Sequence, residues 1–115
     1  MKRGDLFWAD LTHRRGSEQQ GKRPVLILSN DAFNAIPTWH SVTVVPLTTS
    51  PKAMKGPTAI QILRADSGLA ADSIALCHQV TTLDRAQLKG RIGALNASWL
   101  RKVEKGLLIA MGFAI

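Results

Sequence analysis

The sequence predicts a mainly β domain with a C-terminal helix, folded as a small, strongly bent barrel. Short apolar runs alternate with turn-forming residues as far as Leu83, a spacing typical of small β folds. From Leu100 onward, the apolar residues recur at helical spacing instead. The chain has 115 residues, which suffice for one hydrophobic core but not for two. We therefore expect residues 1–115 to form a single domain.

The first strands are predicted from uninterrupted apolar runs. Leu6–Leu11 is expected to be a strand, and Thr12–Arg23 a long polar loop. Val25–Leu28 is apolar at every position, which favours a central strand buried on both faces. Asn30 can cap a turn or a single helical turn that stops near Pro37.

Prolines and turn residues divide the middle of the chain. Val42–Leu47 is predicted as a strand, and Pro46 within it indicates an edge position or a bulge, because proline cannot donate a hydrogen bond to a ladder. Thr48–Pro57 contains two prolines, a glycine and two lysines, which are typical of a mobile loop. Three further strands are expected at Thr58–Leu63, Ser73–Gln79 and Val80–Leu83.

The last segment is predicted to be a helix that packs on the barrel. Its apolar residues follow helical spacing and its cations lie on the opposite side: Leu100, Val103, Leu107, Leu108 and Met111 against Arg101, Lys102 and Lys105. Asn96 or Ser98 is expected to cap its start, and Gly112 to end it. Gly106 lies inside this helix, where glycine costs about 1 kcal/mol relative to alanine.

The charge balance indicates a polyanionic partner. Fifteen Lys and Arg against eight Asp and Glu give a net charge of +7 and a pI near 10.4, which suits nucleic acid or an acidic protein segment. Rows of aromatic side chains that stack bases are not expected, since there are three Trp, three Phe and no Tyr.

Location and redox state are predicted from what the sequence lacks. The longest apolar tract, Gly106–Ile115, is shorter than the roughly 20 residues that cross a bilayer. No secretory segment is visible, so the cytoplasm is the expected location. A single cysteine, Cys77, permits no internal disulfide, and its apolar neighbours predict a buried, inert thiol.

Neither a nucleotide nor a metal is expected as a cofactor. Gly16, Gly21 and Lys22 have the spacing of a phosphate-binding P-loop, but that motif requires Ser or Thr where this chain has Arg23. A strand also follows the loop, where the motif opens a helix. The three histidines show no ligand spacing: His13, His40 and His78.

A pairing across the chain predicts phosphate chemistry. If the strands around Val25–Leu28 pair, Arg23 and Thr48 could face one groove. A planar guanidinium binds phosphate oxygens bidentately, and the threonine hydroxyl could add a hydrogen bond. Glu18 is the nearby carboxylate that could take a proton. RNA brings its own nucleophile, the 2′-hydroxyl, so these groups would suffice for a ribonuclease. A turn-forming loop in which Arg23 pairs with Glu18 explains the same residues equally well.

Two stretches and several shorter ones closely resemble the MazF/PemK (Kid) family of bacterial toxins. They are KRGDLFWADL at 2–11 and GSEQQGKRPVL at 16–26, followed by LSND at 28–31, VVPLTT at 44–49, GL at 68–69, DS at 72–73 and QVTTLD at 79–84. The resemblance implies a homodimer of SH3-like barrels, the fold of the CcdB, MazF and PemK toxins. It implies metal-independent cleavage of single-stranded RNA, often mRNA, that leaves a 2′,3′-cyclic phosphate and a 5′-hydroxyl. It also implies a MazE-type antitoxin whose acidic tail blocks the RNA groove.

The resemblance also implies roles for individual residues. Arg23 and Thr48 match the catalytic centre, and Glu18 matches a loop position tied to activity. Bases are expected to be selected in the loop Thr48–Pro57. RNA contacts are expected from Ser17, Gln19, Thr49, Lys52, Lys55, His78 and Gln79.

Departures from the family pattern leave the general base open. Some relatives have a histidine where this chain has Ser17, and Arg-Cys-Asp-Gln where it has Leu76–Gln79. Arginine stays protonated and is therefore a poor general base. Arg23 is expected to stabilise charge, and it could also donate a proton to the leaving oxygen. His78 is one candidate for the base, since imidazole titrates near neutral pH.

Two other functions fit the sequence. One is a gyrase-poisoning toxin of the CcdB type, which acts by protein binding; such relatives end in Trp-Gly-Ile, whereas this chain ends in Met-Gly-Phe-Ala-Ile. The other is a non-catalytic protein that binds RNA or sequesters an antitoxin. Cleavage of RNA by the purified protein would separate the ribonuclease from both.

Overall fold

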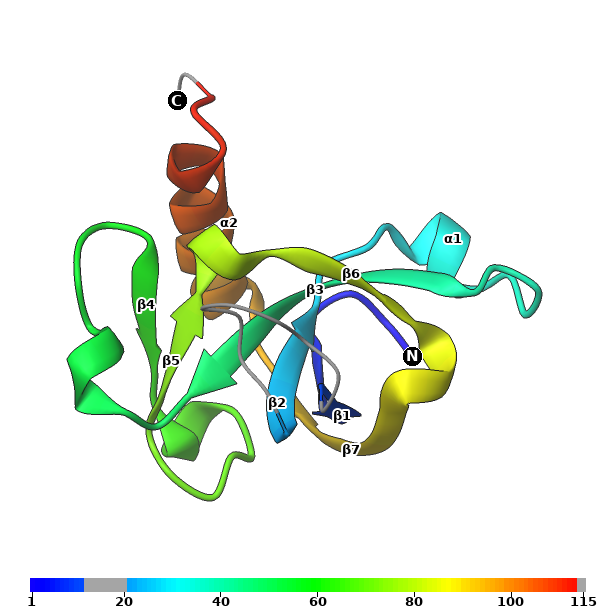
Figure 1. Ribbon diagram of the computed structural model, residues 1–115, viewed down its shortest axis with the longest axis horizontal. Helices are drawn as coiled ribbons and strands as arrows, with labels where there is room; N and C mark the ends of the chain where they lie inside the picture. The colour runs from blue at the N-terminus through cyan, green and yellow to red at the C-terminus, as the bar shows by residue number, and fades with distance from the viewer. Residues whose placement is uncertain (12–20, 114–115) are drawn as a thin grey trace.

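The computed structural model describes residues 1–11 and 21–113, and over these residues the fold is mainly β with a C-terminal helix, as predicted (Figure 1). Its strands are β1 (Asp5–Asp10), β2 (Lys22–Ile27), β3 (Ser41–Thr48), β4 (Ala59–Ile62), β5 (Ser73–Leu76), β6 (Thr81–Asp84) and β7 (Leu88–Ala94). The helices are α1 (Asp31–Asn34) and α2 (Ala97–Ala110). Short 3-10 turns are η1 (Pro51–Ala53), η2 (Arg64–Asp66), η3 (Cys77–Gln79) and η4 (Arg85–Gln87). No helix within the described ranges is long and apolar enough to span a membrane.

The strands form one antiparallel sheet in the order β4-β5-β3-β2-β1-β7. Strand β3 pairs with β2 along one edge, while its other edge is shared: Ser41–Val44 pair with β6, and Leu47 and Thr48 pair with β5. Figure 1 shows β3 crossing the molecule, with α1 beyond its start and β4, β5 and α2 around its end. The two partners that share this edge, β5 and β6, pair with different ends of β3, and the sheet bends around the core.

Pro46 does not mark an edge strand, contrary to the sequence prediction. It lies opposite Val25 of β2, in a strand that has partners on both sides. On the second side, Pro46 falls between the residues that pair with β6 and those that pair with β5. A residue without an N–H donor is tolerated there because the ladder is interrupted at that point.

The two larger parts of the core lie on opposite faces of β2, and a smaller cluster of Ala59, Ile74 and Leu76 lies between β4 and β5. Leu26 packs with Leu6, Leu47 and Val103, between the sheet and α2. On the other face, Val25 and Ile27 pack with residues of β1, β3 and β6: Ala9, Val42, Val44 and Leu83. The prediction of a central strand buried on both faces is confirmed.

Helix α2 is unbroken, and Gly106 has a packing role in it. The Asn96 side chain accepts a hydrogen bond from the Trp99 N–H (3.0 Å), and Gly112 adopts φ +77° just after the helix, so both predicted ends are confirmed. A Cβ at position 106 would lie 3.0 Å from the Cys77 sulfur and 3.1 Å from Cγ1 of Ile60. Glycine therefore allows α2 to approach the barrel closely.

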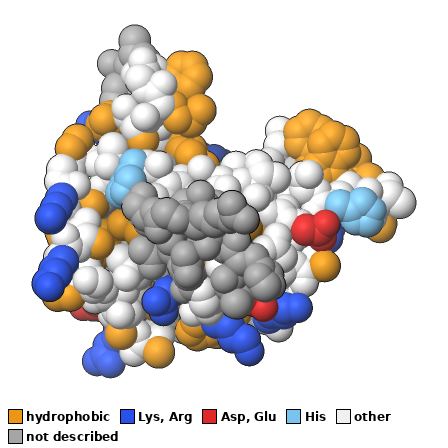
Figure 2. Space-filling model, viewed as in Figure 1, with side chains coloured by type: hydrophobic (Ala, Val, Ile, Leu, Met, Phe, Trp, Pro, Cys, Tyr) orange, Lys and Arg blue, Asp and Glu red, His pale blue; other side chains and the backbone are white. Residues whose placement is uncertain are grey.

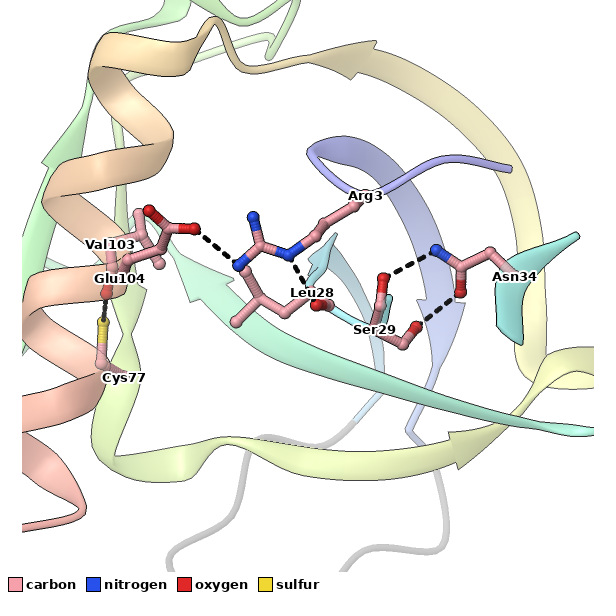
Figure 3. Close-up of polar contacts among 7 residues, drawn as sticks. All are labelled: Arg3, Leu28, Ser29, Asn34, Cys77, Val103 and Glu104. Carbon is pink, nitrogen blue, oxygen red and sulfur yellow. Dashed lines mark hydrogen bonds and ion pairs between the residues drawn. The ribbon is translucent and has the colours of Figure 1, made fainter. Parts of the chain in front are cut away.

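Cys77 is buried, as predicted, beneath this helix. Its side chain has no exposed surface, and Sγ donates to the Val103 carbonyl at 3.6 Å (Figure 3). Burial raises the pKa of the thiol to about 11. Because the thiolate is the nucleophilic form, this cysteine is inert at neutral pH.

Arg3 fastens the N-terminal segment to the barrel and to α2. Its Nε donates to the Leu28 carbonyl (2.9 Å), and its Nη2 lies 2.7 Å from Oε2 of Glu104 (Figure 3). The Arg3 backbone N–H donates to Asp31 Oδ1 (2.7 Å), which lowers the pKa of that carboxyl. Asn30 caps α1 by accepting from the Ala32 N–H, as predicted.

Two further features of the structure differ from what the sequence predicts. The strand expected at Ser73–Gln79 ends at Leu76, and the 3-10 turn η3 follows it. Strand β7 was not predicted, because Gly90 and Gly93 weaken its strand pattern. Its partner β1 comes from the opposite end of the chain.

Candidate active site

A pocket of about 420 Å³ opens where β2 begins and β3 ends. Lys22, Arg23 and Pro24 of β2 line one side, and Leu47, Thr48, Thr49 and Ser50 line the adjoining side. The opposite wall comes from Leu69–Ala71 and Ser73, and Trp8 and Ile92 complete the lining. Residues of five strands (β1, β2, β3, β5 and β7) and of two loop segments (49–50 and 69–71) therefore converge on this cavity.

The pairing of β2 with β3 accounts for the meeting of Arg23 and Thr48. Val25 lies opposite Pro46 in this antiparallel pair, and Leu26 lies opposite Val45. Arg23 comes two residues before Val25, and Thr48 comes two residues after Pro46, so both residues lie at the same end of the β2–β3 pair. The prediction that the two strand ends face one groove is confirmed, because both residues line the pocket.

The Thr48 hydroxyl is held in place with its proton still available. Thr48 is half-buried at the end of β3, and its Oγ1 accepts a hydrogen bond from the Ser50 N–H at 3.2 Å. A hydroxyl can accept and donate at once. The hydroxyl proton can therefore be directed at an anionic oxygen in the pocket.

The cations of β2 give the pocket its charge. Lys22 and Arg23 are adjacent and both exposed, with β1 paired along one side. Figure 2 shows more Lys and Arg than Asp and Glu side chains on this face, in keeping with the net charge of +7. A guanidinium and an ammonium at one strand start are suited to phosphate oxygens.

The far wall of the pocket is fixed by a close contact between Gly68 and Gly93. A Cβ at Gly93 would lie 2.1 Å from the Ser67 carbonyl oxygen, and one at Gly68 would lie 3.0 Å from the Ile92 carbonyl oxygen. Gly68 also has φ +85°, a conformation that side chains rarely adopt. The loop can therefore lie directly on β7, which brings Leu69–Ala71 to the pocket.

Hydrogen bonds also hold the segment 67–72, which forms this wall of the pocket. The buried Ser67 side chain donates to the Leu63 carbonyl (2.9 Å) and accepts from the Leu69 N–H (3.2 Å). Asp72 accepts from the Arg64 N–H at 2.8 Å. The loop is thus fixed at both ends, and so is the width of the pocket.

Nearly the whole chain matches a known protein family. A family model described as a PemK-like, MazF-like toxin of type II toxin–antitoxin systems matches residues 2–111. The chain belongs to this family. It is 38% identical to an endoribonuclease MazF of Staphylococcus epidermidis over 113 residues, which cover 97% of this chain and 92% of the relative.

Solved structures agree with this assignment. An endoribonuclease from a mycobacterial species, in complex with its cognate antitoxin, is 25% identical and has a TM-score of 0.80, covering 100% of this chain and 98% of that one. The Mycobacterium tuberculosis toxin MazF-mt6 is 27% identical with a TM-score of 0.78, covering 96% and 99% of the two chains. MazF from Deinococcus radiodurans, 24% identical over 98% and 97%, matches in fold with a TM-score of 0.81. The barrel-like fold class is therefore confirmed.

The other residues predicted from the MazF/PemK resemblance are spread more widely. Thr49 lines the pocket, whereas Lys52, Lys55, His78 and Gln79 do not. Lys52 and Lys55 are exposed in and after η1. Glu18, Ser17 and Gln19 lie outside the described residues. The RNA contacts of all these residues stay predictions.

His78 is separate from the pocket that holds Arg23. It is exposed in η3, with Nδ1 3.5 Å from Oγ1 of Thr58. Among residues 1–11 and 21–113, no three His, Cys, Asp or Glu side chains gather closely enough to hold a metal ion.

Sequence reasoning missed several residues that line the pocket. Lys22 could have been found, because it adjoins Arg23 at the start of β2. Trp8 was assigned only to a strand, because its neighbours Phe7 and Ala9 are apolar and gave no sign of a site. The wall Leu69–Ala71 had no signal, because it depends on the contact between Gly68 and Gly93.

Proposed function

We propose that this chain is an endoribonuclease toxin that cleaves single-stranded RNA, such as mRNA, at short sequences. Membership of the PemK-like, MazF-like family supports this proposal, as do relatives named endoribonuclease MazF. The single observation that carries it is the pocket shared by Arg23 and Thr48. A guanidinium and an oriented hydroxyl are the groups that phosphoryl transfer requires.

The proposed reaction uses the RNA as its own nucleophile. The 2′-oxygen attacks the adjacent phosphorus and loses its proton to a base, while the bond from phosphorus to the 5′-oxygen breaks. The products are a 2′,3′-cyclic phosphate and a 5′-hydroxyl, which gains a proton. The Arg23 fork binds the non-bridging oxygens as charge develops on them and can protonate the leaving oxygen. The Thr48 hydroxyl adds a hydrogen bond to the same phosphate.

Glu18 is the proposed general base. A carboxylate can accept the 2′ proton, and Glu18 precedes Arg23 by five residues in the sequence. His78 is less suitable, because it does not line the pocket and its ring contacts Thr58. In Glu18→Gln, kcat should fall and the acidic limb of the pH profile should disappear. A retained acidic limb that is lost in His78→Ala would assign the base to His78 instead.

The toxin is proposed to act as a homodimer controlled by an antitoxin of the MazE type. One structural relative was solved with its cognate antitoxin, and the net charge of +7 suits an acidic inhibitory tail. Such a tail would compete with RNA for the cations of the pocket. Light scattering of the purified toxin tests the dimer, and titration of RNA cleavage with the antitoxin tests the competition.

Cleavage of RNA in EDTA by the purified protein is the deciding experiment. Arg23→Ala should lower kcat by at least about 100-fold, the usual effect of removing a group that stabilises developing charge. Arg101→Ala is the matched control, because it removes an exposed cation of α2 that does not line the pocket. Full activity of Arg23→Ala would refute the assignment. Gyrase inhibition without RNA cleavage would favour the CcdB-like alternative.

A further inference from the structure

Trp8 is half-exposed at the edge of the pocket that holds Arg23. It projects from β1, is 44% exposed, and lines the pocket together with Arg23 and Thr48. Burying a large apolar ring is favourable. An indole left open to solvent beside cations therefore needs a reason other than core packing.

The other two tryptophan rings each have a stacking or cation–π partner, whereas Trp8 has none among the described residues. Trp39 stacks on Phe33 with ring centroids 4.7 Å apart, and the Lys102 ammonium lies 4.2 Å over the Trp99 ring. Trp8 has no ring contact or side-chain hydrogen bond with any residue in 1–11 or 21–113. Within that part of the chain, no other ring and no cation stacks on the indole.

The neighbours of Trp8 in the sheet keep this surface open. Pro24 of β2 and Gly90 of β7 lie directly opposite it on the two sides, and neither carries a long side chain. A Cβ built on Gly90 would meet nothing within 4 Å. Because paired residues project to the same face, the space over Gly90 is the space beside the indole.

Irregular pairing sets the direction of Trp8. The register between β1 and β7 shifts between Leu6 and Phe7, and again between Trp8 and Ala9. Such bulges bend a strand and re-aim its side chains, often beside active sites. Ile92, passed over at the first shift, lines the same pocket. The two register shifts therefore flank Phe7 and Trp8, beside the pocket.

We propose that Trp8 stacks on a nucleobase next to the scissile phosphate and so helps to position single-stranded RNA. This inference rests on the proposed ribonuclease function and adds a binding role that the phosphate groups cannot supply. Arg23 and Lys22 hold the backbone of any sequence, whereas an indole holds a flat, unpaired base. Every base has an aromatic face, so Trp8 favours single strands over duplexes.

RNA explains the setting of Trp8 better than a protein partner does. An apolar protein side chain would fit the indole but would bring no charge for Lys22 and Arg23, which line the same cavity. A nucleotide brings a phosphate and an aromatic face joined at a fixed spacing, so one ligand satisfies both kinds of group.

Binding and cleavage by Trp8→Ala test the proposal. The probe is a short RNA that carries the mapped cut site, with a 2′-deoxy nucleotide there to prevent cleavage. Since stacking contributes a factor of about 5 to 150 per base, Kd should rise within that range. The slope of binding against salt should be unchanged, because no phosphate contact is lost. Trp8→Phe should restore binding to within about threefold of wild type, since phenylalanine also stacks.

A cycle with modified RNA separates stacking from a structural role. Removing the base at one position beside the cut should weaken wild-type binding as much as Trp8→Ala does. The same removal should then cost Trp8→Ala almost nothing, because both changes delete one interaction. Additive losses, or Kd values of Trp8→Ala within twofold of wild type, would overturn the role of Trp8.

Two variants control for the fold. Trp39→Ala removes a tryptophan of equal exposure that does not line the pocket, and should bind RNA normally. Gly90→Leu should block the indole and weaken binding, while Gly90→Ala should not. Normal RNA binding by Gly90→Leu, or weaker antitoxin binding alone in Trp8→Ala, would also contradict the proposal. Failure of the wild-type protein to bind or cleave any RNA would instead overturn the ribonuclease function itself.

Discussion

Gly93→Ala should damage both the stability and the activity of this protein, although it adds one methyl group. The new Cβ would lie 2.1 Å from the Ser67 carbonyl oxygen, whereas such contacts essentially never fall below 3.0 Å. The loop would have to move by about 0.9 Å, the difference between these two distances. The obstacle is backbone, so no side-chain rotation can relieve it.

The cost of that movement follows from what holds the loop. Overpacking costs about 1–3 kcal/mol, and loss of one Ser67 hydrogen bond adds about 1 kcal/mol. We therefore expect the free energy of unfolding to fall by about 2–4 kcal/mol. The loop also carries Leu69–Ala71 of the pocket, so KM for RNA should rise in whatever fraction stays folded.

Gly90→Ala is the matched control, because it makes the same change in the same strand. Its Cβ meets nothing within 4 Å, and Gly90 does not have a positive φ. Urea denaturation of the two variants should therefore differ by about 2 kcal/mol or more. If the free energies of unfolding of the two variants differ by less than about 0.5 kcal/mol, the close contact between β7 and the 67–71 loop is wrong.

Three further results are expected. Cys77 should react with a thiol reagent only on unfolding. Because burial raises its pKa from the ordinary value of 9.0 to about 11, the thiol's contribution to stability is complete below pH 9 and falls as the pH rises toward 11. Cys77→Ala should abolish this dependence in urea titrations. The pKa of Asp31 is lowered from 3.8 by the Arg3 N–H and the Asn34 side chain. The contribution of this carboxylate to stability is therefore present above pH 3.8 and is lost as acid protonates the folded carboxyl. Equal acid sensitivity of Asp31→Asn and wild type would contradict this. Arg85 donates to the carbonyls of Asn34 (3.0 Å), Ile36 (3.3 Å) and Trp39 (3.1 Å). Arg85→Ala should therefore speed amide hydrogen exchange in residues 33–39 while leaving RNA cleavage intact. Unchanged exchange would contradict this role of Arg85.

Local patterns were enough to predict most of the fold. Val25–Leu28 could be assigned as a doubly buried strand because its apolar run is uninterrupted, and α2 because its apolar residues recur at helical spacing. The position of Pro46 could not be predicted. Its tolerance depends on β6 and β5 sharing one edge of β3, and no local pattern encodes which strands become neighbours.

The candidate site was predictable only in part, for the same reason. Arg23 and Thr48 flank two consecutive strands, so simple adjacency of those strands brings them together. Trp8 and the wall Leu69–Ala71 depend on the pairing of β1 with β7 and on the contact of Gly68 with Gly93. These contacts join residues far apart in the sequence, and they could be found only from the structure.

The late position of β7 in the chain bears on how such a toxin is made. β7 supplies Ile92 to the pocket, and Gly93 seats the loop that forms the far wall. A ribosome therefore releases Arg23 and Thr48 well before the residues that complete their cavity. Since chains begin to fold from the N-terminus during synthesis, the nascent protein passes through a long stage with its cationic strands exposed but no finished pocket. The pocket is complete only after residues as late as Gly93 have left the exit tunnel.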